Sequence, residues 1–585
     1  MPTLEWIGKG KVINHHQEVP FRVLDRRYSF DESGQHAGDN GSSENMIIHG
    51  DNLEALKALL PRFEGQVKCI YIDPPYNTGN ENWVYNDNVN DPKIKKWLGE
   101  VVGKEGEDLT RHDKWLCMMY PRLKLLQKLL AEDGAIFISI DDTEYANLKL
   151  ICDEIFGGNC FVSNISWQRT YSTRNDSKGI VNEVEHLLVY SKQPGWSPNK
   201  LPRTAEMNSI YKNPDNDVQA WASDNPFAPG AATHQGMVYA IQHPFTGEMI
   251  YPSNRACWRY QQDQMLEIMR GWCDYELRDI NDARERAAVC GISESEIRKG
   301  VQAIVLSKSL EASVEQAKKV YKRGQWPKFY FTKGGLGGIR RKTYIDSVEG
   351  KPPTNLWQYT DVGHTDEAAK TLKAIFEGRA TFDTPKPSRL IERVLQIAGD
   401  SETLILDSFA GSGTTAHAVL NMNKADGGHR KFILVEMMDY ADSITAERVK
   451  RVIQGYGEGK KAVEGTGGSF SFYDLGPVLL LPNGNLNEEV GPQKIREYIW
   501  FMETKQPYAP PIGDNPYYLG KHNSTGYYFY YEPQRVTVLD YAFLSTITEK
   551  ADGTVIYADR CSISEDKLAK MGVTFKKIPR DISRL

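Results

Sequence analysis

Residues 404–415 read LILDSFAGSGTT, and this stretch decides the fold. A short apolar run ends at Asp407 and a glycine-rich turn follows, which predicts a strand, a turn and the start of a helix. Gly411 and Gly413 permit a tight turn and let a ligand approach the backbone closely. The start of a helix offers free N–H groups and partial positive charge, so this turn suits a carboxylate or a phosphate.

The alternation of strands and helices continues on both sides of this turn. Apolar runs predict strands, and apolar residues at helical spacing predict helices. The expected strands are 45–51, 67–72, 135–140, 403–406 and 431–435, and the expected helices are 115–130, 143–156, 388–397 and 414–421. Such alternation predicts an α/β fold, with a mostly parallel sheet that helices cover on both faces.

Changes in composition divide the chain into parts. Residues 192–360 are rich in Pro, Gly, Asn, Trp and Tyr, and only residues 279–320 are strongly helical in pattern. We therefore expect an inserted domain there. The expected parts are a polar, irregular N-terminal segment (1–45), two halves of one α/β domain (46–191 and 361–455) around the insertion (192–360), a glycine-rich linker (455–468) and a smaller C-terminal domain (470–585).

Charge and cysteine content exclude several classes of protein. The 585 residues include 71 Lys and Arg against 77 Asp and Glu, for a net charge of −6. Any contact with nucleic acid must therefore come from local basic patches. The eight cysteines include no CxxC spacing, so neither a zinc site nor a disulfide scaffold is expected. The chain begins without a signal peptide and has no apolar run long enough for a membrane span, so we expect a cytoplasmic protein.

A second motif, Asp73-Pro74-Pro75-Tyr76, directly follows the strand predicted at 67–72. The prolines stiffen the loop and remove two N–H donors, so it offers the Asp73 carboxylate and the Pro74 carbonyl as acceptors beside an aromatic ring. These groups suit a planar base with an exocyclic amine: the acceptors would bind the amine, and the Tyr76 ring would stack on the face of the base. The alternative is a proline-stiffened turn that Asp73 caps, and the position at a strand end favours the functional interpretation.

The strand after the glycine turn ends at Glu436, 23 residues beyond Gly413. An acidic residue at about this separation binds the ribose in Rossmann-like nucleotide sites. The turn is not a GxGxxG fingerprint, and the chain has no phosphate-binding P-loop motif. The alternative is a packing turn followed by a surface glutamate, but the strand, turn, helix and acid together favour a cofactor site.

The two motifs together resemble those of the amino-methyltransferases that use S-adenosylmethionine. Their order, with DPPY first, resembles the β class of DNA amino-methyltransferases. Nearly the whole chain resembles the modification (Mod) subunit of type III restriction–modification systems. The segments that carry this resemblance are IHGDNLEALKALL (48–60), YIDPPYNTGN (71–80), GAIFISIDDTEYANLKLICDEIFG (134–157), EHLLVYSK (185–192), TPKPSRLIERVL (384–395), RKFILVE (430–436) and VIYADRCSISEDKLAKMGVTFKKIPRDI (555–582).

The resemblance implies a Rossmann-like S-adenosylmethionine-dependent methyltransferase with an inserted target-recognition domain. It implies methylation of adenine N6 in double-stranded DNA by base flipping and direct attack, with Asp73, Pro74, Pro75 and Tyr76 holding the base. A homodimer and a helicase–nuclease partner are also implied. The cofactor-binding residues that it implies are Asp51, Lys386, Asp407, Phe409, Gly411, Gly413, Thr414 and Glu436. Asp51 could instead cap a helix, and Lys386 could be a surface charge before one.

The best candidate for a DNA contact in the insertion is residues 321–342, which are basic, interleaved with aromatic residues and free of acidic ones. Basic groups neutralise phosphates, and arginine can read guanine edges. A second, smaller patch lies at 167–174. The expected DNA-binding residues are Arg169, Arg174, Lys322, Arg323, Trp326, Lys328, Lys333, Arg340, Arg341 and Lys342. The alternative is a solvated basic hairpin whose aromatic residues belong to a core.

Three rival functions stay open at this point. Cytosine-N4 methylation uses an amine with the same two N–H groups, methylation of a protein glutamine amide uses similar chemistry, and a DNA-recognition subunit could have lost catalysis. His112 and Asp113 suggest a metal site, but Asp113 is better explained as the cap of the helix that bears Trp115. Transfer from a sulfonium needs no metal, so we expect none.

Overall fold

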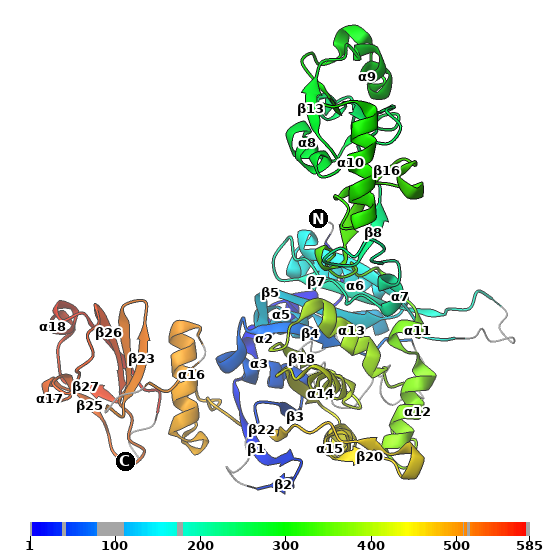
Figure 1. Ribbon diagram of the computed structural model, residues 1–585. Helices are drawn as coiled ribbons and strands as arrows, with labels where there is room; N and C mark the ends of the chain where they lie inside the picture. Colours follow the sequence, from blue (N-terminus) through cyan, green and yellow to red (C-terminus); the bar gives the residue numbers. More distant parts are fainter. Residues whose placement is uncertain are drawn as a thin grey trace. The chain divides into compact units, whose positions relative to one another are not determined.

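The computed structural model describes residues 3–37, 43–78, 110–171, 179–506, 508–511 and 515–580. The chain forms two compact units (Figure 1). One unit is Lys200–Pro352, and the other combines Met1–Asn199 with Pro353–Leu585. The smaller unit lies within the stretch that composition marks as an insertion.

A mostly parallel sheet of eleven strands runs through the larger unit, in the order β17-β6-β7-β5-β4-β18-β19-β3-β22-β1-β2. The strands from β5 to β22 all run parallel, and antiparallel pairs flank them on both sides. This confirms the predicted α/β class. The strands are β1 (Arg22–Asp31), β2 (Gly34–His36), β3 (Met46–His49), β4 (Val67–Ile72), β5 (Leu130–Ile140), β6 (Phe161–Gln168), β7 (Val184–Ser191), β17 (Leu356–Trp357), β18 (Leu404–Asp407), β19 (Lys431–Glu436) and β22 (Phe470–Val478).

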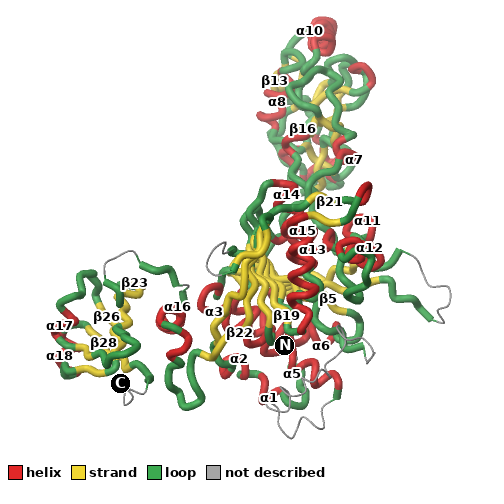
Figure 2. The backbone as a smooth tube through the Cα atoms, turned by 90° about the horizontal axis from the view of Figure 1, so that it is seen from below, coloured by secondary structure: helices red, strands yellow, loops and turns green. Residues whose placement is uncertain are grey.

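Helices cover both faces of this sheet (Figure 2). Ile70 and Ile72 of β4 belong to one buried core with the apolar residues of α3, α5 and α6, while Tyr71 between them points to the opposite face. Helices α13 and α14 pack together on that second face. The helices of this unit that precede β22 in the chain are α1 (Lys9–Val12), α2 (His15–Glu18), α3 (Asn52–Phe63), α5 (Arg111–Leu129), α6 (Tyr145–Phe156), α11 (Tyr359–Val362), α12 (Thr365–Ile375), α13 (Ser388–Ala398), α14 (Thr414–Asp426) and α15 (Glu447–Gln454).

The sheet brings two distant segments of the chain together. β4 and β18 are parallel neighbours, and Leu406 lies opposite Ile70. Their carboxyl ends therefore reach the same edge, where Asp73 follows β4 and Asp407 ends β18. Ligands bind at this edge in open α/β sheets.

The prediction of an irregular N-terminal segment was wrong. β1 pairs with β22 along the edge of the central sheet, and Val23, Leu24, Tyr28 and Phe30 are buried. The charged residues between these apolar ones mask the strand pattern, and the pairing partner lies more than 400 residues away. For the same reason β22 belongs to the central sheet, although we placed it in the C-terminal domain.

The C-terminal part has a smaller sheet of its own, in the order β23-β24-β26-β28. Tyr528 of β24 packs into one buried cluster, while its neighbours Tyr527 and Phe529 pack into another. The aromatic residues of β24 therefore form a strand that is covered on both faces. The elements here are α16 (Pro492–Thr504), β23 (Tyr518–His522), β24 (Thr525–Phe529), β25 (Val538–Leu539), α17 (Tyr541–Leu544), β26 (Gly553–Ala558), β27 (Arg560–Cys561), α18 (Glu565–Lys570) and β28 (Val573–Lys577).

The unit Lys200–Pro352 has small sheets and short helices. The helical prediction for residues 279–320 holds for α9 and α10 but fails between them. Residues 303–306 form the buried strand β14, which pairs with β10 and β13. Its main elements are β8 (Trp221–Asp224), β10 (Ile241–Gln242), α8 (Gln262–Arg270), β13 (Tyr275–Arg278), α9 (Ala283–Cys290), β14 (Ala303–Leu306), α10 (Leu310–Arg323), β15 (Phe329–Phe331) and β16 (Ile339–Tyr344).

Candidate active site

The loop after β4 is fixed by a neighbouring helix. The indole Nε1 of Trp115, on α5, donates to the Pro75 carbonyl at 2.7 Å. Pro74 and Tyr76 are buried, whereas Asp73 and Pro75 are half-buried. The carboxylate of Asp73 therefore reaches the carboxyl edge of the sheet from a rigid support.

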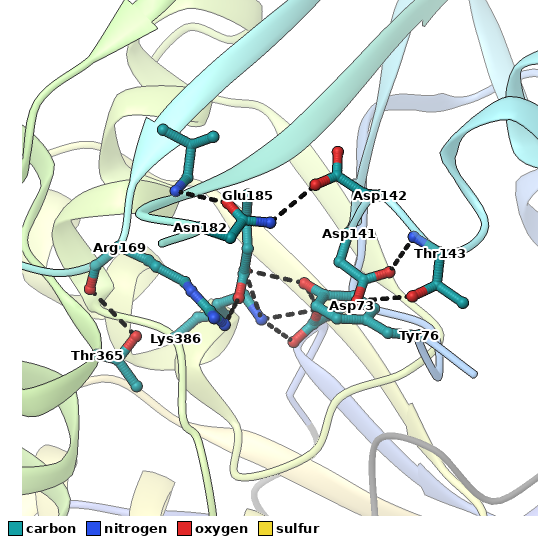
Figure 3. A network of polar contacts seen from close by, with 11 residues as sticks. Asp73, Tyr76, Asp141, Asp142, Thr143, Arg169, Asn182, Glu185, Thr365 and Lys386 are labelled. Carbon is teal, nitrogen blue, oxygen red and sulfur yellow. Dashed lines mark hydrogen bonds and ion pairs between the residues drawn. The ribbon is translucent and has the colours of Figure 1, made fainter. Parts of the chain in front are cut away.

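Lys386 lies directly on the Asp73 carboxylate (Figure 3). Its Nζ donates to Oδ1 at 2.9 Å and to Oδ2 at 2.8 Å, and its side chain is only 7% exposed. The alternative of a surface charge is therefore wrong for Lys386. The resemblance implied a cofactor contact, whereas the contact that the structure provides is an ion pair with the candidate catalytic carboxylate.

Glu185 completes this polar cluster, and sequence reasoning missed it. Its Oε2 lies 3.1 Å from the Tyr76 hydroxyl and 3.6 Å from Lys386 Nζ, and its Oε1 accepts from Arg169 Nη1 at 3.0 Å. Glu185 is the second residue of β7, which runs antiparallel to β5, so the start of β7 lies at the carboxyl edge of the sheet. A charged residue opening the apolar run EHLLVYS is the signal that could have revealed it.

Burial and neighbouring charges shift the pKa values of this cluster. Burial raises the pKa of Asp73; Lys386 opposes that rise and Glu185 adds to it. Burial also pushes the pKa of Glu185 upward, but Lys386 and Arg169 outweigh burial, so this pKa lies below its ordinary value. Lys386 is buried, yet Asp73 and Glu185 raise its pKa and keep it charged. The cluster therefore holds two cations against two acids of unequal strength.

The glycine turn after β18 has the conformation that its sequence predicts. Gly411 has φ 52° and Gly413 has φ 82°, in the left-handed region that favours glycine. The Gly411 N–H donates to Glu436 Oε2 at 2.9 Å, and the Met438 N–H donates to Oε1 at 2.9 Å. Glu436 is 2% exposed, so the alternative of a surface glutamate is wrong.

Asp407 supports this turn from below. Its carboxylate accepts from the Phe409 N–H at 3.0 Å and from the Thr415 hydroxyl at 2.6 Å. Burial raises the pKa of Asp407 to about 7. Asp407 is itself buried, while Phe409 is half-buried at the edge. The contacts of Asp407 with Phe409 and Thr415 stabilise the conformation of the turn.

A buried arginine that sequence reasoning also missed lies behind the turn. Arg448 Nη1 donates to the Ser412 hydroxyl at 2.7 Å and to the Thr414 hydroxyl at 2.8 Å. The Thr414 hydroxyl also lies 3.3 Å from the Lys386 carbonyl. The glycine turn and the segment that carries Lys386 are thus joined through Thr414.

Asp51 is the N-cap of α3, which is the alternative to cofactor binding that the sequence leaves open. Its Oδ1 accepts from the N–H groups of Leu53 and Glu54 at 2.9 and 3.2 Å. Its Oδ2 lies 3.3 Å from Arg122 Nη2. The next residue, Asn52, donates to the carbonyl of Ser408 at 3.2 Å, so the start of α3 adjoins the glycine turn.

Within the part of the chain that the structure describes, neither His112 nor a cysteine belongs to a group that could hold a metal ion. Among the described residues, no group of three or more His, Cys, Asp and Glu side chains could hold a metal ion. His112 Nδ1 lies 2.6 Å from Glu144 Oε1. Our assignment of Asp113 as the cap of α5 was wrong: Thr110 is the N-cap, and Asp113 accepts from its N–H at 3.0 Å in a capping box. No described helix is long and apolar enough to cross a bilayer.

The basic residues of the insertion differ in their exposure and in their polar contacts. Lys322, Arg323, Lys328 and Lys333 are exposed. Arg340 and Arg341 are half-buried, with Arg340 Nε on the Ser223 hydroxyl at 3.1 Å and Arg341 paired with Asp224. Trp326 is half-buried and stacks on Tyr321 and Tyr330, so it serves the core of this unit.

The prediction that Lys342 contacts DNA was wrong. Its side chain is fully buried, and its Nζ donates to Asp215 at 2.5 Å and to Asp217 at 2.6 Å. Two carboxylates fix this ammonium inside the unit, away from any phosphate. In the second patch, Arg169 contacts Glu185 and is 40% exposed, and Arg174 lies outside the described residues.

The chain is similar in sequence to known proteins. The N6/N4 family described as DNA methylase matches residues 67–447. The StyLTI Mod subunit of a type III restriction–modification enzyme from Salmonella typhimurium is 32% identical over 71% of this chain and 58% of its own length. The EcoPI Mod subunit of Escherichia phage P1 is 28% identical, over 74% of this chain and 63% of its own. The chain thus spans about three fifths of these relatives.

A shorter relative is covered more fully. The type II methyltransferase M.KpnI of Klebsiella pneumoniae is 30% identical over 68% of this chain and 81% of its own length. Among solved structures, the cytosine-N4-specific PvuII DNA methyltransferase matches with a TM-score of 0.31 at 13% identity, over 70% of this chain and 87% of its own. The family match spans more than half of the chain and includes both DPPY and the glycine turn. The chain belongs to the N6/N4 DNA methylase family.

Proposed function

We propose that this protein transfers a methyl group from S-adenosylmethionine to the N6 amine of adenine in double-stranded DNA. The observation that carries the proposal is the placement of the Asp73 carboxylate and the Gly411–Gly413 turn at the ends of neighbouring strands. One motif offers acceptors for an amine, and the other offers a cradle for a cofactor. Methyl transfer needs both groups side by side.

The first site suits an amine on a planar ring. Asp73 and the Pro74 carbonyl can accept the two N–H groups of the amine, which draws its lone pair out of conjugation with the ring. The lone pair would then be free to attack the methyl carbon that S-adenosylmethionine supplies, and the electrons of the carbon–sulfur bond would leave with sulfur. Tyr76 presents an aromatic ring for stacking on the base. Because duplex DNA hides N6, the target base must leave the helix first.

The second site has the groups that the cofactor needs. The left-handed glycines have no side chains, so the methionine part of the cofactor could approach the backbone of the turn. Glu436, anchored by two backbone N–H groups, stands where a ribose diol would be held. Phe409 would add an apolar contact, with Asp51 nearby at the N-terminus of α3. When bound, S-adenosylmethionine supplies a methyl group on an electrophilic sulfonium centre.

The remaining parts of the proposal rest on the resemblance to Mod subunits. Residues 200–352 would recognise the target sequence, with Lys322, Arg323, Lys328 and Lys333 on DNA phosphates. The relatives named as Mod subunits belong to restriction–modification enzymes, so we propose a restriction subunit as a partner, a homodimer as the working form and the cytoplasm as the location.

The test uses mixed genomic DNA and labelled S-adenosylmethionine, with mass spectrometry of the digested nucleosides. We expect N6-methyladenine with the wild type and none with Asp73→Ala, while the variant retains cofactor binding. N4-methylcytosine would change the base and keep the site. If the protein binds the cofactor and DNA but forms no methylated product, its role is DNA recognition and not catalysis. If a protein amide is methylated instead, DNA is not the substrate.

A further inference from the structure

The hydroxyl of Tyr76 lies between two carboxylates. It is 2.9 Å from Asp73 Oδ1 and 3.1 Å from Glu185 Oε2. Both distances are those of hydrogen bonds. A tyrosine hydroxyl has a single hydrogen, however, so it can donate to one of these carboxylates at a time.

The number of protons in this cluster decides whether both contacts are favourable. If Asp73 and Glu185 are both ionised, one of the two oxygen–oxygen contacts has no hydrogen in it. If Asp73 gains one proton, its O–H donates to the Tyr76 oxygen, and the Tyr76 O–H turns to Glu185. Both contacts are then hydrogen bonds. The cluster is therefore arranged to take up one proton at Asp73.

We propose that Glu185 is a positioning residue of the methylation reaction: it accepts the hydrogen of the Tyr76 hydroxyl, so that the Tyr76 oxygen can accept from Asp73 when Asp73 receives the proton released by the amine. This inference rests on the proposed function, because the reaction must produce such a proton. It assigns a role to a residue outside the DPPY motif. Glu185 acts through Tyr76 and does not touch the base.

The methylation reaction releases one proton, and this cluster can receive it. When the amine nitrogen forms its bond to the methyl carbon, it becomes a cation and must lose one hydrogen. Asp73, which already accepts an N–H of that amine, takes this proton and becomes neutral. The Tyr76 O–H then donates to Glu185, which stays ionised. After the product leaves, Asp73 returns the proton to water, and the hydroxyl turns back.

The charges around the cluster favour protonation of Asp73 over protonation of Glu185. Burial raises the pKa of Asp73, whereas Lys386 and Arg169 outweigh burial at Glu185 and hold its pKa low, so Asp73 is the acid that takes the proton. Lys386 and Arg169 balance the two carboxylates. Among the described residues, Tyr71 on β4 and Asp407 on β18 also interact with the charges of this cluster.

The test compares Glu185→Gln with the wild type in single-turnover methylation of DNA across a pH series. The amide keeps the shape of Glu185 but removes its charge. We expect the plateau rate to fall at least about 10-fold, with DNA and cofactor binding changed less than about twofold. The acid limb of the profile should move to lower pH, because removing Glu185 removes a charge that raises the pKa of Asp73.

Glu154→Gln is the matched control. Glu154 also accepts from a tyrosine hydroxyl, that of Tyr120 at 2.9 Å, and from a lysine, Lys9 at 3.0 Å, but it lies on α6 outside the cluster. We expect this control to keep the wild-type profile. An equal loss of rate in the control, or a Glu185→Gln enzyme with the wild-type rate and acid limb, would overturn the inference.

A second variant and a second readout make the test independent of one substitution. Tyr76→Phe keeps the ring and removes the hydroxyl, so the double variant with Glu185→Gln should be no slower than the slower single variant. In cofactor-free protein, infrared titration should show a carboxyl that protonates at lower pH in Glu185→Gln than in the wild type. A wild type that methylates nothing would sink the proposed function, whereas an active wild type with additive variants and an unmoved carboxyl would sink this inference alone.

Discussion

Lys386 donates to both carboxylate oxygens of Asp73, although 313 residues separate the two in the chain. The ion pair connects the loop after β4 with the segment before α13. Through the Lys386 carbonyl and Thr414, it also reaches the glycine turn after β18. The proposed base site and the proposed cofactor site are therefore connected through Lys386, so we expect a change in one to affect the other.

We expect Lys386→Met to lower both stability and activity. The change leaves Asp73 and Glu185 buried near each other without their shared cation, and breaking a buried ion pair costs about 3–5 kcal/mol. Since Lys386 lowers the pKa of Asp73, its removal should move the acid limb of the pH–rate profile to higher pH. Thermal unfolding and single-turnover rates across pH measure the two effects.

Lys424→Met provides the comparison for this loss. Lys424 pairs with Glu464 at 3.0 Å on the surface, where the glutamate side chain is 89% exposed. Exposed pairs contribute about 0–1 kcal/mol, so this variant should unfold close to the wild type. Equal unfolding temperatures for the two variants would show that burial of the Lys386 pair has no energetic consequence.

Gly411→Asp should abolish cofactor binding and leave DNA binding intact. The new side chain would fill the turn and place a second negative charge beside Glu436, whose Oε2 accepts from the Gly411 N–H. Gly427→Asp is the control, because Gly427 also has a positive φ, 71°, but has open space around it. It should cost about 1–2 kcal/mol of stability for the left-handed backbone and spare binding. Calorimetric titration with S-adenosylmethionine distinguishes the two, and normal binding by Gly411→Asp would contradict this site.

Asp407 should make stability depend on pH. Its folded pKa is about 7, above the ordinary value of 3.8, so the folded protein binds a proton that the unfolded chain lacks between about pH 4 and pH 7. The contribution of Asp407 to stability therefore falls as pH rises through that range. Asp407→Asn removes this dependence. The unfolding temperature of Asp407→Asn, relative to that of the wild type, should therefore rise from pH 4 to pH 7. A difference in unfolding temperature that stays constant over this range would refute the raised pKa of Asp407.

The sequence predicted the parts of the site that depend on contiguous residues. The glycine turn and Glu436 lie within one strand–turn–helix–strand unit, whose spacing follows from local geometry. The resemblance named Lys386 but not its pairing with Asp73, and spacing pointed to neither Glu185 nor Arg448, because the partners of these residues are set by the order of strands in the sheet. A lone Lys or Glu before a helix or in a strand carries no sign of the charge that it will meet.

Long-range pairing explains the errors in the fold as well. β1 has a weak alternating pattern, and its partner β22 lies more than 400 residues further on. Lys342 looked like its basic neighbours in a stretch without acidic residues. The carboxylates that bury it, on Asp215 and Asp217, come from more than 120 residues earlier. The composition of residues 321–342 therefore shows that the segment is basic and aromatic, but it does not show which distant residues pair with its charges.

The basic residues of the insertion should separate into DNA contacts and structural charges. Lys333→Gln and Lys328→Gln remove exposed charges, so each should weaken DNA binding and reduce the slope of log affinity against log salt by about 0.9. Lys342→Met instead leaves two carboxylates unpaired in the interior and should lower the unfolding temperature of residues 200–352. Salt titrations of fluorescent duplex binding, run beside thermal unfolding, assign each residue. Exposed lysines whose removal leaves the salt slope unchanged would place the DNA on another face of this unit.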